Sequence, residues 1–260
     1  MQSEAGAIAT VHRALQNGTL ATTYTASQGL LLMIPNMYKI AGEMLPCVIN
    51  VAARSLATHS LSILGDHQDI YSVRQTGFAI FATSSPQQVM DLTAVPYLSA
   101  IKGRIPFVNF FDGFRTSHEL DKVEVIDLDK LKKLIDKKKL KEFKSRALSI
   151  NNVTRGTNQN DDIYFQITES RNKYYDELPD IVNNLTGRDY KPFNYYGDPK
   201  ATKVIVAMGS VCGTIKDTVD YLNSQNDSVG LIEVHLYRPF SEKYFLDVLP
   251  KTVKKIAVLD

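Results

Sequence analysis

Three short segments consist almost entirely of apolar residues, and they constrain the fold more than any other feature of the chain. They are PCVINVAAR at 46–54, AIFATSS at 79–85 and PFVNFFDGF at 106–114. A strand with one solvated face alternates apolar and polar residues, whereas nearly continuous apolar runs are typical of strands buried on both faces. We therefore expect a parallel sheet flanked by helices, which places the chain in the α/β class.

The segments between these strands carry helical patterns, as parallel connections require. A helix is expected at 3–18, where Ser3 is suited to cap the first turn and Gly18 to end the helix. Two further helices are expected at 30–44 and 86–103, and a threonine-rich strand is expected at 20–27.

A second, partial α/β unit is expected after a change in composition. Residues 129–148 predict one lysine-covered helix with a narrow apolar stripe, and 149–199 predict an extended linker with little periodicity. Beyond it, alternating strands and helices are expected at 203–210, 214–225, 229–240, 241–249 and 254–260. The last strand ends at Asp260 in the middle of a fold, which suggests a piece of a longer polypeptide. The lysine-rich helix is more simply a solvated face than a docking surface for an acidic electron carrier.

Composition excludes several classes of function. The chain has 260 residues and a net charge of only +2, too small to indicate nucleic acid or a membrane surface as a partner. No apolar run approaches the about 20 residues that span a bilayer, and no signal peptide is visible, so the default compartment is cytoplasmic. Cys47 and Cys212 lie in apolar surroundings and are expected to be buried, reduced thiols.

Two charged residues stand where a ligand site is expected. In open parallel sheets, ligands bind beyond the carboxyl ends of the strands, and Arg54 directly follows an expected buried strand. Its guanidinium suits a carboxylate or phosphate ligand, although a structural ion pair is the commoner role for such an arginine. Glu4 lies in the first turn of the expected first helix, where a carboxylate also serves the helix dipole and the cap.

Weaker candidates have simpler structural explanations. GDHQD at 65–69 has acid and imidazole groups at spacings suited to a metal, but a hydrogen-bonded loop is favoured because no third strong ligand is nearby. His59 and His118 are more simply core or loop histidines than general bases. MGSVCGT at 208–214 is suited to cradling a phosphate, but a tight turn from strand to helix explains it equally well.

Longer motifs resemble one enzyme family. The stretch from SEAGAIATVHRAL to AIFATSS, together with IPFVNFFDGFRTSHEL, RGTNQNDDIYFQ, VIVAMGSVCGT and LYRPF, is similar to the pyruvate:ferredoxin (flavodoxin) oxidoreductases. The resemblance covers nearly the whole chain. It implies a pyrimidine-binding domain at 1–198, truncated at its amino end, and the start of a transketolase C-terminal-like domain at 199–260. It also implies thiamine diphosphate with Mg²⁺ and [4Fe-4S] clusters as cofactors, with the diphosphate site and the clusters outside this chain.

The resemblance assigns roles to both charged residues. Glu4 matches the glutamate that contacts the aminopyrimidine ring of thiamine diphosphate and favours its imino tautomer. Arg54 matches the arginine that holds the carboxylate of pyruvate. The family's substrate-contacting threonine lies upstream of the match and is absent here, and no cysteine cluster is present, so the chain on its own is expected to be inactive.

The resemblance further implies an enzyme that converts pyruvate and coenzyme A into acetyl-CoA and carbon dioxide and reduces ferredoxin or flavodoxin. It implies a homodimer in the cytoplasm or in an anaerobic energy organelle. Two alternatives stay open: a non-catalytic domain like the amino-terminal part of some sulfite reductase flavoprotein subunits, and a docking module that uses the lysine-rich helix. Retention of both Glu4 and Arg54 speaks against the first alternative, since an assembly role needs neither residue.

Overall fold

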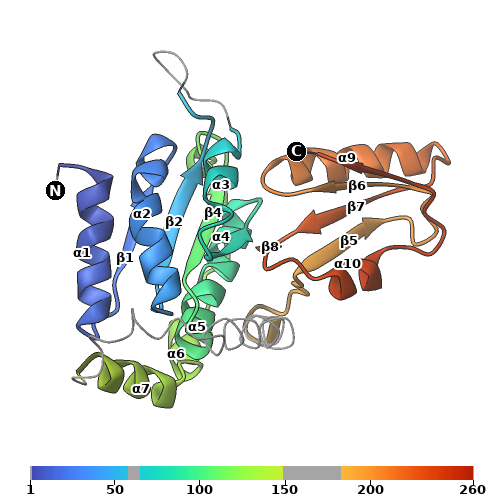
Figure 1. Ribbon diagram of the computed structural model, residues 1–260. Coiled ribbons are helices and arrows are strands. Elements are labelled where there is room, and N and C mark those ends of the chain that lie inside the picture. The colour runs from blue at the N-terminus through green and yellow to red at the C-terminus, as the bar shows by residue number, and fades with distance from the viewer. Residues whose placement is uncertain (1, 58–64, 149–182, 260) are drawn as a thin grey trace.

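A mostly parallel five-stranded sheet forms the centre of the first unit in the computed structural model, which describes residues 2–57, 65–148 and 183–259 (Figure 1). The strands in spatial order are β1 (Thr22–Thr25), β2 (Val48–Ala53), β4 (Phe107–Asp112), β3 (Ala79–Ala82) and β8 (Leu236–Arg238). The first four are parallel, and β8 pairs antiparallel with β3. The three apolar runs thus form β2, β3 and β4, which confirms the predicted parallel sheet.

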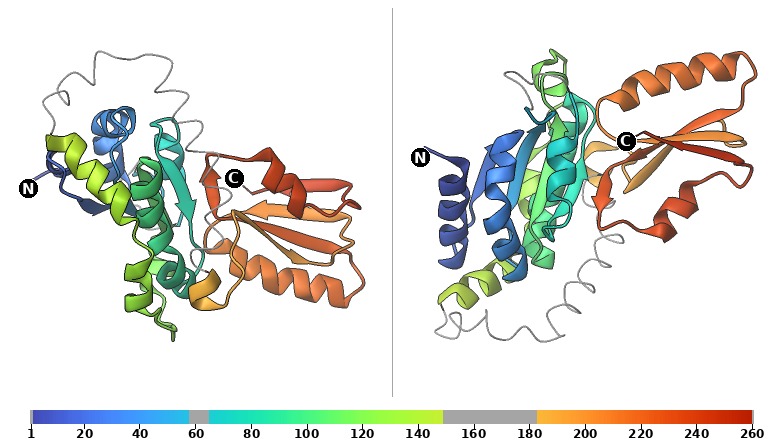
Figure 2. Two further views of the ribbon diagram at one scale, coloured as in Figure 1. Left: turned by 90° about the horizontal axis from the view of Figure 1, so that it is seen from below. Right: turned by 45° about the horizontal axis from the view of Figure 1, so that its top comes forward.

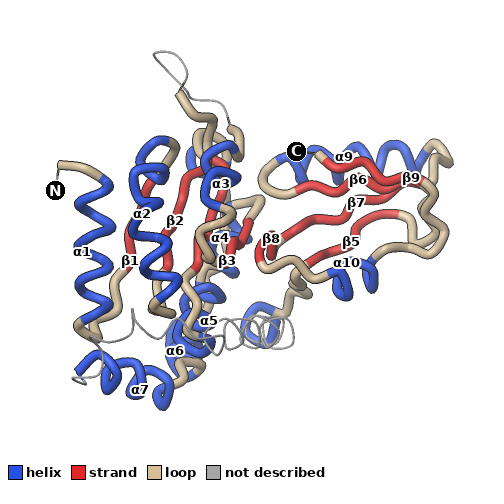
Figure 3. Tube along the Cα trace, viewed as in Figure 1, coloured by secondary structure: helices blue, strands red, loops and turns tan. Residues whose placement is uncertain are grey.

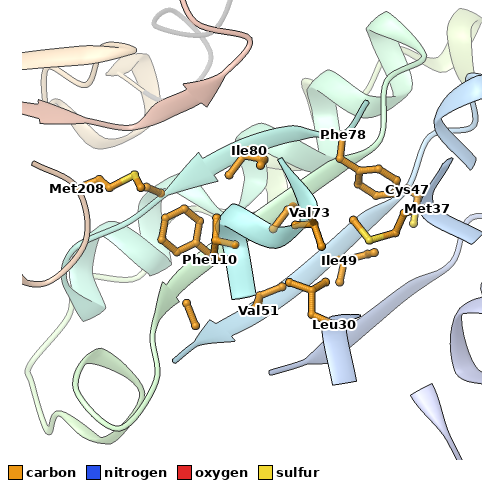
Figure 4. Close-up of a cluster of buried hydrophobic side chains, with 14 of the residues drawn as sticks. Leu30, Met37, Cys47, Ile49, Val51, Val73, Phe78, Ile80, Phe110 and Met208 are labelled. Atoms are coloured by element: carbon orange, nitrogen blue, oxygen red, sulfur yellow. The ribbon is translucent and has the colours of Figure 1, made fainter. Parts of the chain in front are cut away.

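Helices cover both faces of this sheet, which explains the continuous apolar runs (Figure 2). On one face, α1 (Glu4–Gln16), α2 (Gln28–Gly42) and α3 (Gln68–Val73) share one hydrophobic cluster with Ile49 and Val51 of β2. Figure 4 shows Leu30 and Met37 of α2 and Val73 of α3 in this cluster. On the other face, α4 (Pro86–Leu92) and α5 (Ala94–Gly103) pack against Val48 and Phe107. Successive residues of β2 therefore point to opposite apolar layers.

The prediction of a single helix at 86–103 is wrong, because α4 ends at Leu92 and α5 begins at Ala94. Pro96 accounts for the interruption: it has no N–H to donate to the carbonyl of Leu92, so the helical hydrogen-bond ladder is broken there. The intervening residue, Thr93, keeps helical dihedral angles.

The prediction of a single lysine-rich helix at 129–148 is also wrong. The chain forms α6 (Leu128–Lys133) and α7 (Lys137–Leu148), after a short 3₁₀ helix, η1 (Thr116–His118). Asp127 caps α6 by accepting from two backbone amides, and Asp136 accepts from the amide of Lys139 at the start of α7. A second capping carboxylate in the middle of a lysine-rich run thus starts a new helix.

The second unit contains a four-stranded sheet with helices α9 (Val211–Ser224) and α10 (Glu242–Val248) (Figure 3). Its strands in spatial order are β5 (Phe193–Gly197), β7 (Val229–Val234), β6 (Lys203–Ala207) and β9 (Lys255–Val258). The prediction of a linker at 149–199 is wrong for residues 193–197, which form β5 and pair antiparallel with β7. Residues 149–182 of the expected linker lie outside the described part. This pairing favours a domain boundary before Phe193.

The expected strand at 229–240 divides between the two sheets. The amides of His235 and Leu236 both donate to the carbonyl of Pro192, so the ladder stops after β7, and the chain continues as β8 in the first sheet. The same crossing buries Glu233, which accepts hydrogen bonds from Ser84 and Gln88 of the first unit. One segment therefore fastens the two units together.

Candidate functional site

The carboxyl ends of the parallel strands meet at one edge of the first sheet. Thr25 of β1 lies beside Val51 of β2, and Ala53 of β2 lies beside Asp112 of β4, so these three strands end close together. Figure 1 shows β2 pointing toward the end of the sheet at which α1 begins. This is the edge at which open α/β sheets bind ligands.

Glu4 reaches this edge from the start of α1. The hydroxyl of Ser3 already accepts the hydrogen bond from the amide of Ala5, so the helix is capped without the Glu4 carboxylate. The Glu4 side chain lies over Gly29 at the start of α2: a methyl group placed on Gly29 would be 2.9 Å from Glu4 Cγ and 2.6 Å from Thr25 Oγ1. Thr25 Oγ1 is buried and has no hydrogen-bond partner.

Arg54 reaches the same edge as the residue that follows β2. Its side chain is half-buried, and its Nε is buried without a hydrogen-bond partner. Its guanidinium carbon lies 5.6 Å from the ring centroid of Phe114, within cation–π range. Among the ion pairs between described residues, none involves Arg54, so the described structure does not support the structural ion pair that sequence reasoning left open.

The turn beside which Glu4 lies is joined to the loop that carries Arg54. Ser27, in the turn between β1 and α2, donates from its hydroxyl to the carbonyl of Ser55 at 2.9 Å. The amides of Ser27 and Arg54 both donate to the Asp69 carboxylate. Glu4, in the first turn of α1 and against Gly29, and Arg54, in the loop after β2, thus lie at one edge of the sheet.

The chemistry of this edge suits an organic ligand with both polar and anionic groups. Glu4 offers a carboxylate acceptor, Arg54 offers a guanidinium whose buried Nε has no hydrogen-bond partner, and Thr25 offers a buried hydroxyl that also has none. Buried polar atoms are nearly always hydrogen-bonded, so two such atoms without partners, Thr25 Oγ1 and Arg54 Nε, indicate a place where another molecule supplies the partner.

The structure accounts for the weaker candidates in structural terms. Within GDHQD, Asp69 is buried, and His67 lies 2.6 Å from Asp112 through its Nε2. Among the described residues, no group of three metal-ligating side chains is present. His118 is the exposed last residue of η1 and is stacked on Phe114, whereas His59 lies outside the described residues.

The MGSVCGT segment forms a tight turn, and the backbone amide of Ser210 in this turn already has a hydrogen-bond acceptor. Gly209 adopts a φ of +77°, which favours glycine, between β6 and α9. The amide and hydroxyl of Ser210 both donate to Asp112 Oδ2, at 2.7 and 2.5 Å. Burial raises the pKa of Asp112, but its bonds to His67 and Ser210 outweigh that effect and hold the pKa below its usual value. The carboxylate of the first unit thus takes the place that an anion would occupy.

Sequence reasoning missed this group, in which His67, Asp112 and Ser210 line a cavity of about 490 Å³ between the two units. An aspartate at the end of the PFVNFFDGF strand and a Gly-Ser turn were the available signals, but their pairing is a long-range contact. The two cysteines do match expectation, because both are buried free thiols.

The described fold and site define a class: an α/β protein with a candidate ligand-binding edge on a parallel sheet and a second α/β unit packed beside it. Residues 1–186 match a family model described as "Pyruvate flavodoxin/ferredoxin oxidoreductase, thiamine diP-bdg", and residues 201–260 match "Pyruvate:ferredoxin oxidoreductase core domain II". The chain belongs to the pyruvate flavodoxin/ferredoxin oxidoreductase family.

Individual relatives agree with this assignment. The chain is 61% identical to the pyruvate-flavodoxin oxidoreductase of Enterobacter agglomerans and 56% identical to the pyruvate:ferredoxin oxidoreductase of Moorella thermoacetica. Each match covers 100% of this chain and 23% of the relative, so the chain spans about a quarter of the length of these proteins.

A solved structure shares the fold. It is a 2-oxoglutarate:ferredoxin oxidoreductase from Magnetococcus marinus with 2-oxoglutarate, coenzyme A and succinyl-CoA bound, matched with a TM-score of 0.69 at 15% identity. The match covers 99% of this chain and 49% of the other. Within the described part of the present chain, no helix is both long and apolar enough to cross a membrane.

Proposed function

We propose that this chain forms the thiamine-binding edge of a larger pyruvate:ferredoxin or flavodoxin oxidoreductase. The enzyme would convert pyruvate and coenzyme A into acetyl-CoA and carbon dioxide, with the electrons passing to ferredoxin or flavodoxin. The observation that carries this proposal is the placement of Glu4 and Arg54, which has no ion pair among the described residues, at one edge of the parallel sheet in a chain 61% identical to such an enzyme.

Glu4 would hold the aminopyrimidine ring of thiamine diphosphate. When bound, the cofactor would supply a nucleophilic carbon and an electron sink for decarboxylation. The Glu4 carboxylate would accept a hydrogen bond from a protonated ring nitrogen and so favour the imino tautomer of the aminopyrimidine. Gly29 leaves room for the Glu4 side chain, since any larger residue would overlap it.

Arg54 would hold the carboxylate of pyruvate. Its guanidinium is attached to the end of a buried strand and lies against Phe114, so its position is restrained before a substrate binds. A restrained cation orients the substrate without first losing conformational entropy. A charge-assisted bond of this kind contributes about 1.5–3 kcal/mol.

The remaining components would come from parts of the enzyme outside this chain. They are the Mg²⁺ and diphosphate site and the [4Fe-4S] clusters, for which the two buried, separated cysteines are unsuited ligands. A homodimer, located in the cytoplasm or an anaerobic energy organelle, is part of the same proposal. The comparisons give no support to the alternatives of an assembly domain or a docking module.

Substitutions in the full-length enzyme test the two roles. Arg54→Gln is expected to raise the KM for pyruvate about 10- to 100-fold, because it removes a charge-assisted bond. Glu4→Gln is expected to lower kcat about 100-fold or more and to weaken thiamine diphosphate binding. Arg74→Gln, an exposed arginine bonded to the carbonyl of Tyr71, is the control.

The outcome that contradicts the proposal is an unchanged pyruvate KM in Arg54→Gln together with unchanged cofactor affinity in Glu4→Gln. The chain by itself is expected to give no pyruvate-dependent reduction of a viologen dye. Measurable reduction by the purified chain would overturn the view that the site needs the rest of the enzyme.

A further inference from the structure

Asp69 is a fully buried carboxylate in the first turn of α3, with 0% of its surface exposed. Its Oδ2 accepts from the amides of Ser27 at 2.9 Å and Arg54 at 3.3 Å, and its Oδ1 accepts from the amide of Ile70 at 2.8 Å. One side chain therefore bonds to the turn after β1, the loop after β2 and its own helix.

A buried carboxylate is costly, so its retention calls for a reason. Burial raises the pKa of Asp69 to about 6, and the three backbone amides together with His67 only partly offset that effect. No ion pair among the described residues involves Asp69, and its carboxylate accepts hydrogen bonds from three backbone amides. The main effect of these bonds is to fix the course of the backbone at two loops.

One of these loops is strained. Ser27 is buried and has a φ of 49° and a ψ of −128°, a combination that side-chain-bearing residues rarely adopt. Backbone strain of this kind persists only where surrounding contacts enforce it. The hydrogen bond from the Ser27 amide to Asp69 is such a contact, and Gly29, on which Glu4 lies, follows two residues later.

We infer that Asp69 is the positioning residue of this edge, and that its carboxylate sets both the turn against which Glu4 lies and the backbone of Arg54. The inference rests on the proposed function. Among the described residues, no ion pair joins Asp69 to Arg54, and the carboxylate bonds to the Arg54 backbone amide, so Asp69 acts through the backbone. Because both loops share one anchor, its loss displaces the cofactor contact and the substrate contact together.

Asp91 provides a matched control for the general cost of altering a buried aspartate. It is also 0% exposed, and it accepts from Arg188, Tyr190 and Gln87. These bonds involve side chains of α4 and of the segment that leads into the second unit, and none involves the loops at the candidate site. A purely structural role for Asp69 would make its variant behave like the Asp91 variant.

The experiment compares Asp69→Asn with Asp91→Asn in the full-length holoenzyme. It measures the pyruvate KM, the dissociation constant of thiamine diphosphate from the apoenzyme, and the Tm. For Asp69→Asn we expect both constants to rise about tenfold or more, as misplacement of reacting groups predicts. For Asp91→Asn we expect a lower Tm with both constants within about twofold of wild type.

Two results overturn the inference: an Asp69→Asn enzyme whose constants match those of Asp91→Asn, or one in which only a single constant changes. If Asp69→Asn does not fold, Asp69→Glu keeps the charge but moves the carboxylate by one methylene group, and the same joint rise is expected. Unchanged constants in folded Asp69→Glu also overturn it. Arg54→Gln distinguishes failure of the Asp69 inference from failure of the proposed function, because an unchanged pyruvate KM in Arg54→Gln refutes the proposed function itself.

Discussion

Replacement of Gly29 by alanine tests whether the space above this residue is reserved for Glu4. The added methyl group would lie 2.6 Å from Thr25 Oγ1, and 2.9 and 3.1 Å from Glu4 Cγ and Cδ. Non-bonded atoms approach to about 3.5–4 Å, so the Glu4 side chain would have to move by about 1 Å. A misplacement of that size costs about 100-fold in rate, which corresponds to about 3 kcal/mol in the activation free energy.

The same substitution is expected to change stability little. Alanine is favoured over glycine within a helix by about 1 kcal/mol, while overpacking costs about 1–3 kcal/mol, so the two effects partly cancel. Gly42→Ala is the matched control: it lies at the other end of α2, and a methyl group there would meet nothing within 4 Å. Gly29→Ala should therefore lose activity without a large fall in Tm.

The assay is pyruvate-dependent viologen reduction by the full-length enzyme, with thiamine diphosphate affinity measured in parallel. We expect kcat/KM of Gly29→Ala to fall about 100-fold and its cofactor affinity to weaken, while Gly42→Ala stays near wild type. A Gly29→Ala enzyme whose kcat/KM lies within about threefold of the Gly42→Ala value would refute the reasoning, because the overlap would then have no consequence at the site.

Three further predictions concern buried polar groups. The Glu233 carboxylate is 4% exposed and lies 2.6 Å from Lys216 Nζ. Lys216→Met leaves this buried carboxylate without that cation, so we expect the unfolding free energy, measured by urea denaturation, to fall by about 3 kcal/mol. Burial raises the pKa of Glu233, but its charged and hydrogen-bonding neighbours, including Lys216, outweigh that effect and hold the pKa at about 2. The stabilising contribution is therefore present above pH about 4.5 and lost as pH falls toward 2, so the stability difference between wild type and Glu233→Gln should shrink over that range. Burial raises the pKa of Cys47 to about 12 and also raises that of Cys212, so neither thiol should react with a thiol reagent at pH 8 until the chain is unfolded; rapid labelling of the native protein would contradict this.

Local sequence determined most of the first unit. The apolar runs predicted β2, β3 and β4 because residues buried on both faces leave a pattern that a short window reveals. The positions of Glu4 and Arg54 followed from the same reasoning, since one lies in the first turn of a helix and the other at the end of a strand. Both features depend on nearest neighbours along the chain.

Tertiary structure decided which segments meet. The β5 strand, FNYYG, lacks a clear local pattern and becomes a strand through its pairing with β7. After β7 the chain leaves that sheet, and β8 pairs with β3 in the first sheet. Asp69 appeared in the sequence as one carboxylate of a possible metal loop, yet in the structure it binds the amides of Ser27 and Arg54. Periodicity reports how much of a residue is buried, but the partner of a backbone amide or a carboxylate depends on how distant segments pack, and only the folded chain sets that.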